Sequence, residues 1–227
     1  RSVEQYIGSP DNALLGLQTR VRLFNTLRLY GQLMLDDYNF SRRDEGSGYW
    51  GNKFAYQLGA KVVNPFQLSA IDLQLEYNHI RPYTYAHVNP AASFLHYGQP
   101  LAHPNGANLA EWLMVVNWWP RAGLWVQLQA RHLNQGTDPP GMNYGSQLRK
   151  SNIDRSTAEP VSEFGHFTGQ GRPFTSSVLG GSVATPLWRY DLWLELKGQV
   201  RSDTGQDGQL WVSLGLRRRL PRQNFFY

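Results

Sequence analysis

The sequence has 227 residues, a formal net charge of +5, 13% aromatic residues and no cysteine, which fits one all-β unit and excludes disulfides and thiolate metal sites. Polar or charged residues interrupt every apolar run before the roughly 18 residues that a membrane helix needs, which excludes a helical membrane protein. The positive charge does not predict a nucleic-acid partner, because arginines such as Arg20 are spread singly among apolar residues and acidic residues such as Glu76 occupy equivalent positions.

Nine segments of about ten residues alternate between apolar and polar positions, which is the period of a β-strand. The difference between the apolar and polar positions is smallest in the fifth segment, which has apolar residues on both faces, and in the seventh, which is rich in glycine and serine. In chain order the segments are 15–23, 27–36, 53–62, 71–78, 111–118, 124–131, 178–185, 192–201 and 210–217. Strands of this length suit a tilted bilayer crossing, which needs about 9 to 11 residues.

The predicted connections alternate between short and long. Short turns are expected at 25, 64–67, 120–123 and 188–189, and long polar connections at 39–49, 81–107 and 136–173. Short periplasmic turns and long external loops are typical of transmembrane barrels. A soluble β-sandwich is the alternative, but it has no reason to place every long loop at one end.

Aromatic residues gather at both ends of the predicted strands, as expected for the two interfaces of a membrane. Beside the short turns lie Phe24, Phe66, Trp118, Trp119, Trp125, Trp188 and Tyr190, and at the opposite ends lie Tyr38, Phe40, Tyr49, Trp50, Tyr77 and Tyr83. In a sandwich the same residues would fill the core. Length, connections and aromatics together favour an all-β, antiparallel, up-and-down transmembrane β-barrel in a bacterial outer membrane, in contact with its lipid and lipopolysaccharide.

Residues 1–227 are expected to belong to one barrel domain. With short turns in the periplasm, the ninth strand runs inward and leaves the aromatic end 225–227 in the periplasm. Single-chain bacterial barrels normally have an even number of strands, whereas nine are predicted. We therefore expect the sequence to be the C-terminal portion of a larger barrel.

Several short motifs resemble an outer-membrane family that includes capsule-assembly Wzi-like barrels and barrel proteins associated with gliding motility. The motifs lie at 8–13, 30–37, 51–53, 81–85 (Arg-Pro-Tyr-Thr-Tyr) and 96–104 (His-Tyr-Gly-Gln-Pro-Leu-Ala-His-Pro). The resemblance implies a role in holding capsular or other surface polysaccharide, or in a cell-surface complex such as gliding or secretion machinery with other outer-membrane or periplasmic subunits. It implies no catalytic residues.

The segment 81–108 concentrates aromatic rings and hydrogen-bonding groups that suit sugars. The candidate ligand-binding residues are Arg81, Tyr83, Tyr85, His87, His96, Tyr97, Gln99 and His103. The alternative is structural: these side chains pack the loop onto the barrel mouth while its prolines stiffen it.

No catalytic or cofactor motif is found, and we expect neither an enzyme nor a bound metal or cofactor. His87, His96 and His103 lack the spacing of a zinc site. The acidic residues Asp72, Glu76 and Glu195 share the polar face with basic residues, so ion pairs filling a narrow lumen explain them better than a pair of hydrolytic carboxylates. The expected protein is a non-enzymatic surface protein, and the alternative is an outer-membrane diffusion channel.

Overall fold

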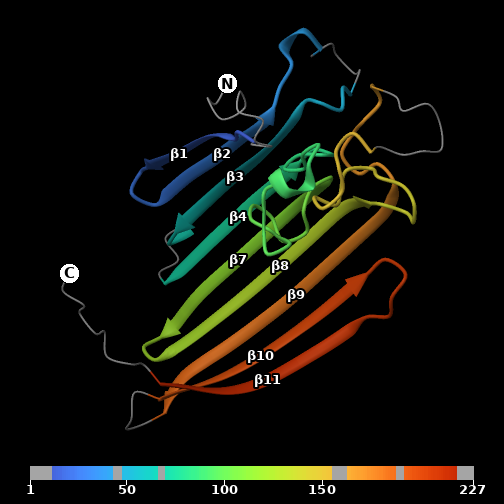
Figure 1. Ribbon diagram of the computed structural model, residues 1–227. Helices are drawn as coiled ribbons and strands as arrows, with labels where there is room; N and C mark the ends of the chain where they lie inside the picture. The colour runs from blue at the N-terminus through green and yellow to red at the C-terminus, as the bar shows by residue number, and fades with distance from the viewer. Residues whose placement is uncertain (1–11, 43–47, 66–69, 155–162, 188–191, 219–227) are drawn as a thin grey trace, which may run out of the picture.

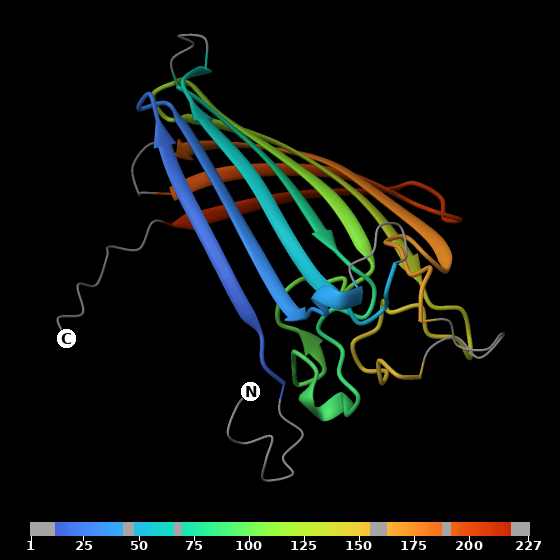
Figure 2. The same ribbon diagram turned by 90° about the horizontal axis from the view of Figure 1, so that it is seen from above.

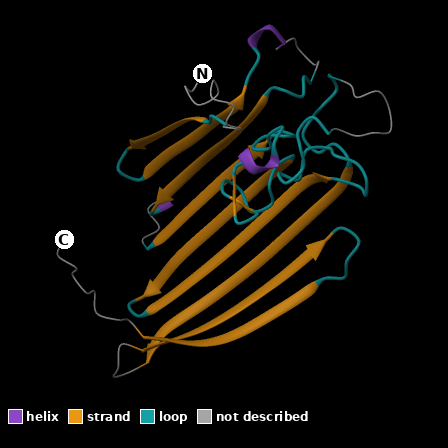
Figure 3. Cartoon of the chain, viewed as in Figure 1, coloured by secondary structure: helices purple, strands orange, loops and turns teal. Residues whose placement is uncertain are grey.

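The chain folds as one large antiparallel β-sheet (Figures 1 and 3). The computed structural model describes residues 12–42, 48–65, 70–154, 163–187 and 192–218. The long strands are β1 (Leu15–Leu23), β2 (Leu27–Asp37), β3 (Lys53–Val63), β4 (Ile71–Ile80), β7 (Leu109–Arg121), β8 (Leu124–Thr137), β9 (Arg172–Leu187), β10 (Leu192–Asp203) and β11 (Gln209–Arg218). Within the described residues, the connections also contain a small hairpin of β5 (Leu95–His96) and β6 (Gln99–Pro100) and the single-turn 3-10 helices Phe40–Arg42 and Pro90–Ala92.

The nine strands lie in the sheet in chain order, each antiparallel to its neighbours. The prediction of nine strands in an up-and-down all-β arrangement is therefore confirmed, including the two segments of weakest contrast, which become β7 and β9. The sheet is twisted and curved but not closed (Figure 2), and within the described residues β1 and β11 form its two edges. Barrel closure is thus not part of the observed fold.

The connections are arranged by length, with three long ones at one end of the sheet (Figure 1). They join β2 to β3, β4 to β7 and β8 to β9. The connection between β10 and β11 lies at the same end but spans only residues 204–208, so the predicted alternation of lengths does not extend to it. At the opposite end, Asn25 and Asn64 adopt positive φ in tight turns, a conformation that asparagine tolerates better than most residues.

The two faces of the sheet differ sharply in polarity. Because neighbouring strands pair residue by residue, side chains on one face form rows across all nine strands. One such row consists entirely of apolar residues: Val21, Leu29, Ala60, Leu75, Met114, Ala130, Leu179, Val200 and Leu210. The neighbouring row, on the other face, contains Arg20, Tyr30, Gly59, Glu76, Leu113, Arg131, Val178, Arg201 and Gln209.

The apolar face carries no covering layer in the described structure. Leucines on both outer strands remain far from buried, with Leu17 at 69% and Leu214 at 71% relative exposure. The buried core lies instead at the end with the long connections, where 81–108, 138–154 and 163–171 pack against the strand ends. Its apolar members are Ala55, Ile80, Tyr85, Ala86, Ala107, Leu109, Leu133 and Leu148.

Asn108 joins the two largest connections to the sheet. It is fully buried and adopts a positive φ of 59°. Its Nδ2 donates to the carbonyl oxygens of Gly136 at 2.8 Å and Gln170 at 2.9 Å, and its Oδ1 accepts from the Gly169 N–H at 2.7 Å. One side chain thereby satisfies backbone groups of β8 and of the segment before β9, which buried backbone requires.

Candidate functional site

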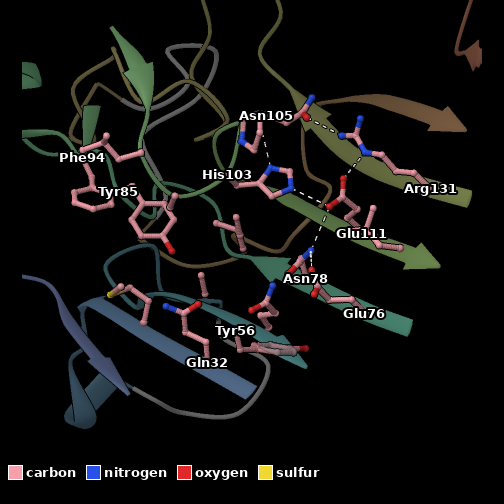
Figure 4. Close-up of a pocket in the computed structure, with 18 residues that line it drawn as sticks. Gln32, Tyr56, Glu76, Asn78, Tyr85, Phe94, His103, Asn105, Glu111 and Arg131 are labelled. Atoms are coloured by element: carbon pink, nitrogen blue, oxygen red, sulfur yellow. Dashed lines mark hydrogen bonds and ion pairs between the residues drawn. The ribbon is translucent and has the colours of Figure 1, made fainter. Parts of the chain in front are cut away.

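A cavity of about 700 Å³ lies between the polar face of the sheet and the segment 81–108 (Figure 4). Strands β2, β3, β4, β7 and β8 supply its floor, and residues 85, 94 and 101–105 supply its roof. Its volume falls within the roughly 300 to 1,000 Å³ of pockets that hold small molecules. The cavity has a polar end and an apolar end, which are built by different parts of the chain.

Glu111 organises the polar end. Its carboxylate is nearly buried, at 4% exposure, and accepts from Asn78 Nδ2 at 3.2 Å, from His103 Nε2 at 3.0 Å and from Arg131 Nε. Arg131 also donates through Nη2 to Asn105 Oδ1 at 2.8 Å. Strands β4, β7 and β8 are thus linked to the roof through one carboxylate.

The protonation of His103 follows from its two partners. The backbone N–H of Asn105 donates to His103 Nδ1 at 3.2 Å, so that nitrogen is an acceptor and carries no proton. The ring proton therefore lies on Nε2, which donates it to Glu111. Arg131 is the permanent cation that offsets the Glu111 charge.

Glu76 is a second carboxylate on the cavity wall. It accepts from the Tyr30 hydroxyl at 2.8 Å and from Asn78 Nδ2 at 3.2 Å, and Gln74 Nε2 in turn donates to the Tyr30 oxygen at 2.9 Å. Asn78 consequently bridges Glu76 and Glu111. Within the described residues, Glu76 forms no salt bridge.

Tyr85 and Phe94 form the apolar end, with ring centroids 5.8 Å apart (Figure 4). Met34 and Leu101 are further apolar residues that line the cavity. Burial, and then the nearby Asp36 carboxylate, raise the pKa of Tyr85 to about 12, so its hydroxyl stays protonated. That hydroxyl makes no hydrogen bond within the described part of the chain, although it borders the cavity.

A buried ion pair fixes the backbone at Tyr85. Asp36 and Lys53 have side-chain exposures of 0% and 2%, and Lys53 Nζ lies 3.1 Å from Asp36 Oδ2. The same oxygen accepts from the Tyr85 N–H at 2.8 Å, and Lys53 Nζ donates to the Ala86 carbonyl at 3.2 Å. Tyr85 has a φ of 72°, an uncommon value for an aromatic residue, and these bonds hold it there.

The structure divides the eight predicted ligand-binding residues into three groups. Tyr85 and His103 line the cavity. His96, Tyr97 and Gln99 are exposed on or beside the β5–β6 hairpin, outside it.

The third group lies against other connections. Arg81 donates through Nη2 to the carbonyl oxygens of Tyr49 at 3.3 Å and His166 at 2.9 Å. Tyr83 is 1% exposed, and its hydroxyl donates to the Asn143 carbonyl at 3.0 Å. His87 is half-buried and donates its backbone N–H to Ser93 Oγ. In this conformation Tyr83 presents no ring face to a sugar, and the binding role of the eight residues stays a prediction.

Sequence reasoning did not single out Glu111, Arg131, Asn78 or Asn105 as site residues. The first three do occupy polar positions of their strands, which is the signal that could have found them. Ion pairs were predicted on this face, and Lys61–Asp72 at 3.2 Å and Lys197–Glu195 at 3.3 Å are such pairs.

Searches against protein-family models, curated proteins and solved structures found no match. The family resemblance therefore rests on the sequence motifs alone. Among the described residues, no three His, Cys, Asp or Glu side chains are grouped to hold a metal ion. No helix in the described ranges is long and apolar enough to cross a membrane.

Proposed function

We propose that this chain forms the wall of a bacterial outer-membrane β-barrel that holds surface polysaccharide without catalysing a reaction. The observation that carries the membrane assignment is the apolar face, which runs unbroken across nine strands and is widely exposed. Soluble monomers rarely expose an apolar patch beyond a few hundred Å², and larger ones mark membrane or protein contacts.

The height of the apolar face supports lipid as its partner. On β10 the apolar positions run from Leu192 to Val200. Eight steps of about 3.4 Å give roughly 27 Å along the strand, or about 21 Å along the membrane normal at a tilt near 40°. That value is close to the apolar band of outer-membrane barrels, about 25 Å tall.

The edge of the apolar face toward the long connections also fits a membrane interface. Tyr56, Tyr77 and Trp112 form a line of contacting rings on the apolar face, with centroids 6.0 Å and 4.6 Å apart. On the same face, Trp112 pairs with His132 of β8, which is hydrogen-bonded to Ser177 at 2.9 Å. Aromatic rings followed by polar groups are expected where hydrocarbon gives way to headgroups.

The polysaccharide role rests on the cavity. It lies at the end of the sheet with the long connections, which face outward if the short turns are periplasmic, and it combines aromatic rings with carboxylates and amides. The motif resemblance points to the same role. The Glu76 and Glu111 carboxylates of the cavity are engaged in hydrogen bonds and, for Glu111, in an ion pair with Arg131.

Matched substitutions on the two faces test the membrane assignment. Leu214→Arg places a charge on the apolar face and should reduce the free energy of folding into lipid vesicles by about 2 to 4 kcal/mol. Gln199→Arg makes the corresponding change on the polar face and should cost much less. Equal losses in a vesicle refolding assay would refute the assignment.

A diffusion channel is the rival function, and conductance separates the two. The segment 81–108 lies over the polar face, where a pore would run, and is tied to Glu111 and Arg131. We therefore expect little or no steady current in planar bilayers. A stable, large conductance would favour the channel, whereas loss of surface polysaccharide from cells lacking the protein would support the proposed role.

A further inference from the structure

We infer that the cavity beneath 81–108 binds a neutral carbohydrate chain and discriminates against sugars that carry carboxylates. This inference rests on the proposed function and specifies its ligand class. Three features of the cavity, as the described residues form it, carry this inference. They are cations that are already paired, a carboxylate with no cationic partner, and a hydroxyl donor without a hydrogen bond beside an apolar wall.

Among the described residues, every cation close to the cavity is already engaged. Arg131 is bound to Glu111 and Asn105, and Lys53 is buried against Asp36 beneath the roof. Both ring nitrogens of His103 are engaged, Nε2 with Glu111 and Nδ1 with the Asn105 N–H. An acidic sugar would therefore have to break an existing ion pair to gain a cationic partner.

The wall also retains negative charge. With Glu111 offset by Arg131, the Glu76 carboxylate remains, held by hydrogen bonds from Tyr30 and Asn78 but by no cation among the described residues. A ligand carboxylate placed beside Glu76 would be repelled. The hydroxyl groups of a neutral sugar can instead donate to this carboxylate, and such charge-assisted hydrogen bonds are stronger than neutral ones.

The opposite end of the cavity suits the apolar face of a sugar ring. Tyr85 and Phe94 present aromatic rings there, and the Tyr85 hydroxyl forms no hydrogen bond with the described part of the chain. A bound hydroxyl could accept from it. The Tyr85 N–H donates to Asp36 Oδ2 at 2.8 Å, and this bond fixes the Tyr85 backbone. The Tyr85 hydroxyl is therefore held in place before a ligand arrives.

Paired oligosaccharides test the inference directly. The full chain, folded in detergent micelles, is titrated calorimetrically with hexagalacturonate and with its carboxyl-reduced neutral counterpart, after both chemical classes have been screened on a glycan array. The neutral form should bind at least about fivefold more tightly, as expected for repulsion between unit charges about 4 Å apart in water.

Three variants locate the effect. Glu76→Gln should lower the ratio of the affinity for the neutral sugar to the affinity for the acidic sugar by about fivefold, because it removes the repelling charge. Tyr85→Phe should weaken neutral binding by about two- to tenfold, the usual worth of one hydrogen bond. Tyr77→Phe is the matched control, since Tyr77 lies on the apolar face and does not line the cavity, and it should change neither affinity.

The possible failures are distinguishable. Equal or tighter binding of acidic sugars would overturn the inference and leave the proposed polysaccharide role intact. Binding that is insensitive to both Glu76→Gln and Tyr85→Phe would show that another surface holds the glycan, which also overturns it. Absence of binding to either class on the array would overturn the polysaccharide role itself.

Discussion

Replacing Asp36 by alanine should destabilise the fold strongly, because it leaves a buried ammonium group without its counter-ion. Asp36 accepts hydrogen bonds from Lys53 Nζ at 3.1 Å, from the Tyr85 N–H at 2.8 Å and from Asn12 Nδ2 at 3.0 Å. After the substitution, Lys53 would keep the Ala86 carbonyl at 3.2 Å as its remaining described partner.

The expected loss of unfolding free energy is about 3 to 5 kcal/mol, the usual cost of removing one partner of a buried ion pair. The orphaned Tyr85 N–H alone accounts for about 1 to 3 kcal/mol of such a cost. Since Tyr85 has positive φ, the roof of the cavity should loosen as well. Replacing both partners, as in Asp36→Leu with Lys53→Met, should cost less than Asp36→Ala alone, because no buried charge remains.

Urea unfolding of the detergent-folded protein, followed by tryptophan fluorescence, measures the change through the shift in midpoint and slope. Asp72→Ala is the control, since Asp72 and its partner Lys61 form an ion pair at 3.2 Å with side-chain exposures of 21% and 32%. That variant should lose about 1 kcal/mol or less. Equal effects of Asp36→Ala and Asp72→Ala would refute the argument from burial.

Two other substitutions test packing and polar satisfaction. Gly59→Ala would place a methyl group 2.1 Å from the Tyr30 ring and should cost about 1 to 3 kcal/mol in the same urea assay, whereas Gly198→Ala, with no atom within 4 Å, should change stability little. Asn108→Asp replaces the amide that donates to Gly136 and Gln170 by an acceptor of the same shape, so limited proteolysis within 138–154 and 163–171 should become faster. Unchanged cleavage relative to wild type would contradict the assigned role of Asn108, and Asn89→Asp at the exposed 3-10 helix serves as the control.

The strands were predictable because their signal is local. Alternation of leucine with polar residues identifies β10 from its own ten or so positions, and even the glycine-rich β9 was located by the same pattern. Closure of the sheet was not predictable in this way. It depends on which strand lies beside β1 and β11, and no pattern within a strand specifies that neighbour.

The candidate site was predicted less well, because its contacts join distant residues. Asp36 belongs to the predicted strand 27–36, but its burial against Tyr85 depends on a residue 49 positions later in the chain. Arg81 was predicted to bind a ligand, whereas in the structure it donates to backbone carbonyls of two other connections. Composition can suggest that a loop binds a ligand, but it does not distinguish that use from packing against other loops.

The pairing of each strand with its neighbours in the chain has a consequence for how such a sheet can change size. Every hydrogen-bonded pair of long strands joins consecutive members of the meander, so a hairpin can be inserted or removed without rethreading any other segment. Adding two strands leaves every existing turn at the end of the sheet where it now lies. Adding one strand would move every later turn to the opposite end of the sheet. Circumference in this architecture should therefore evolve, and be engineered, in steps of two strands, with a wider sheet bringing a wider enclosed space if it closes.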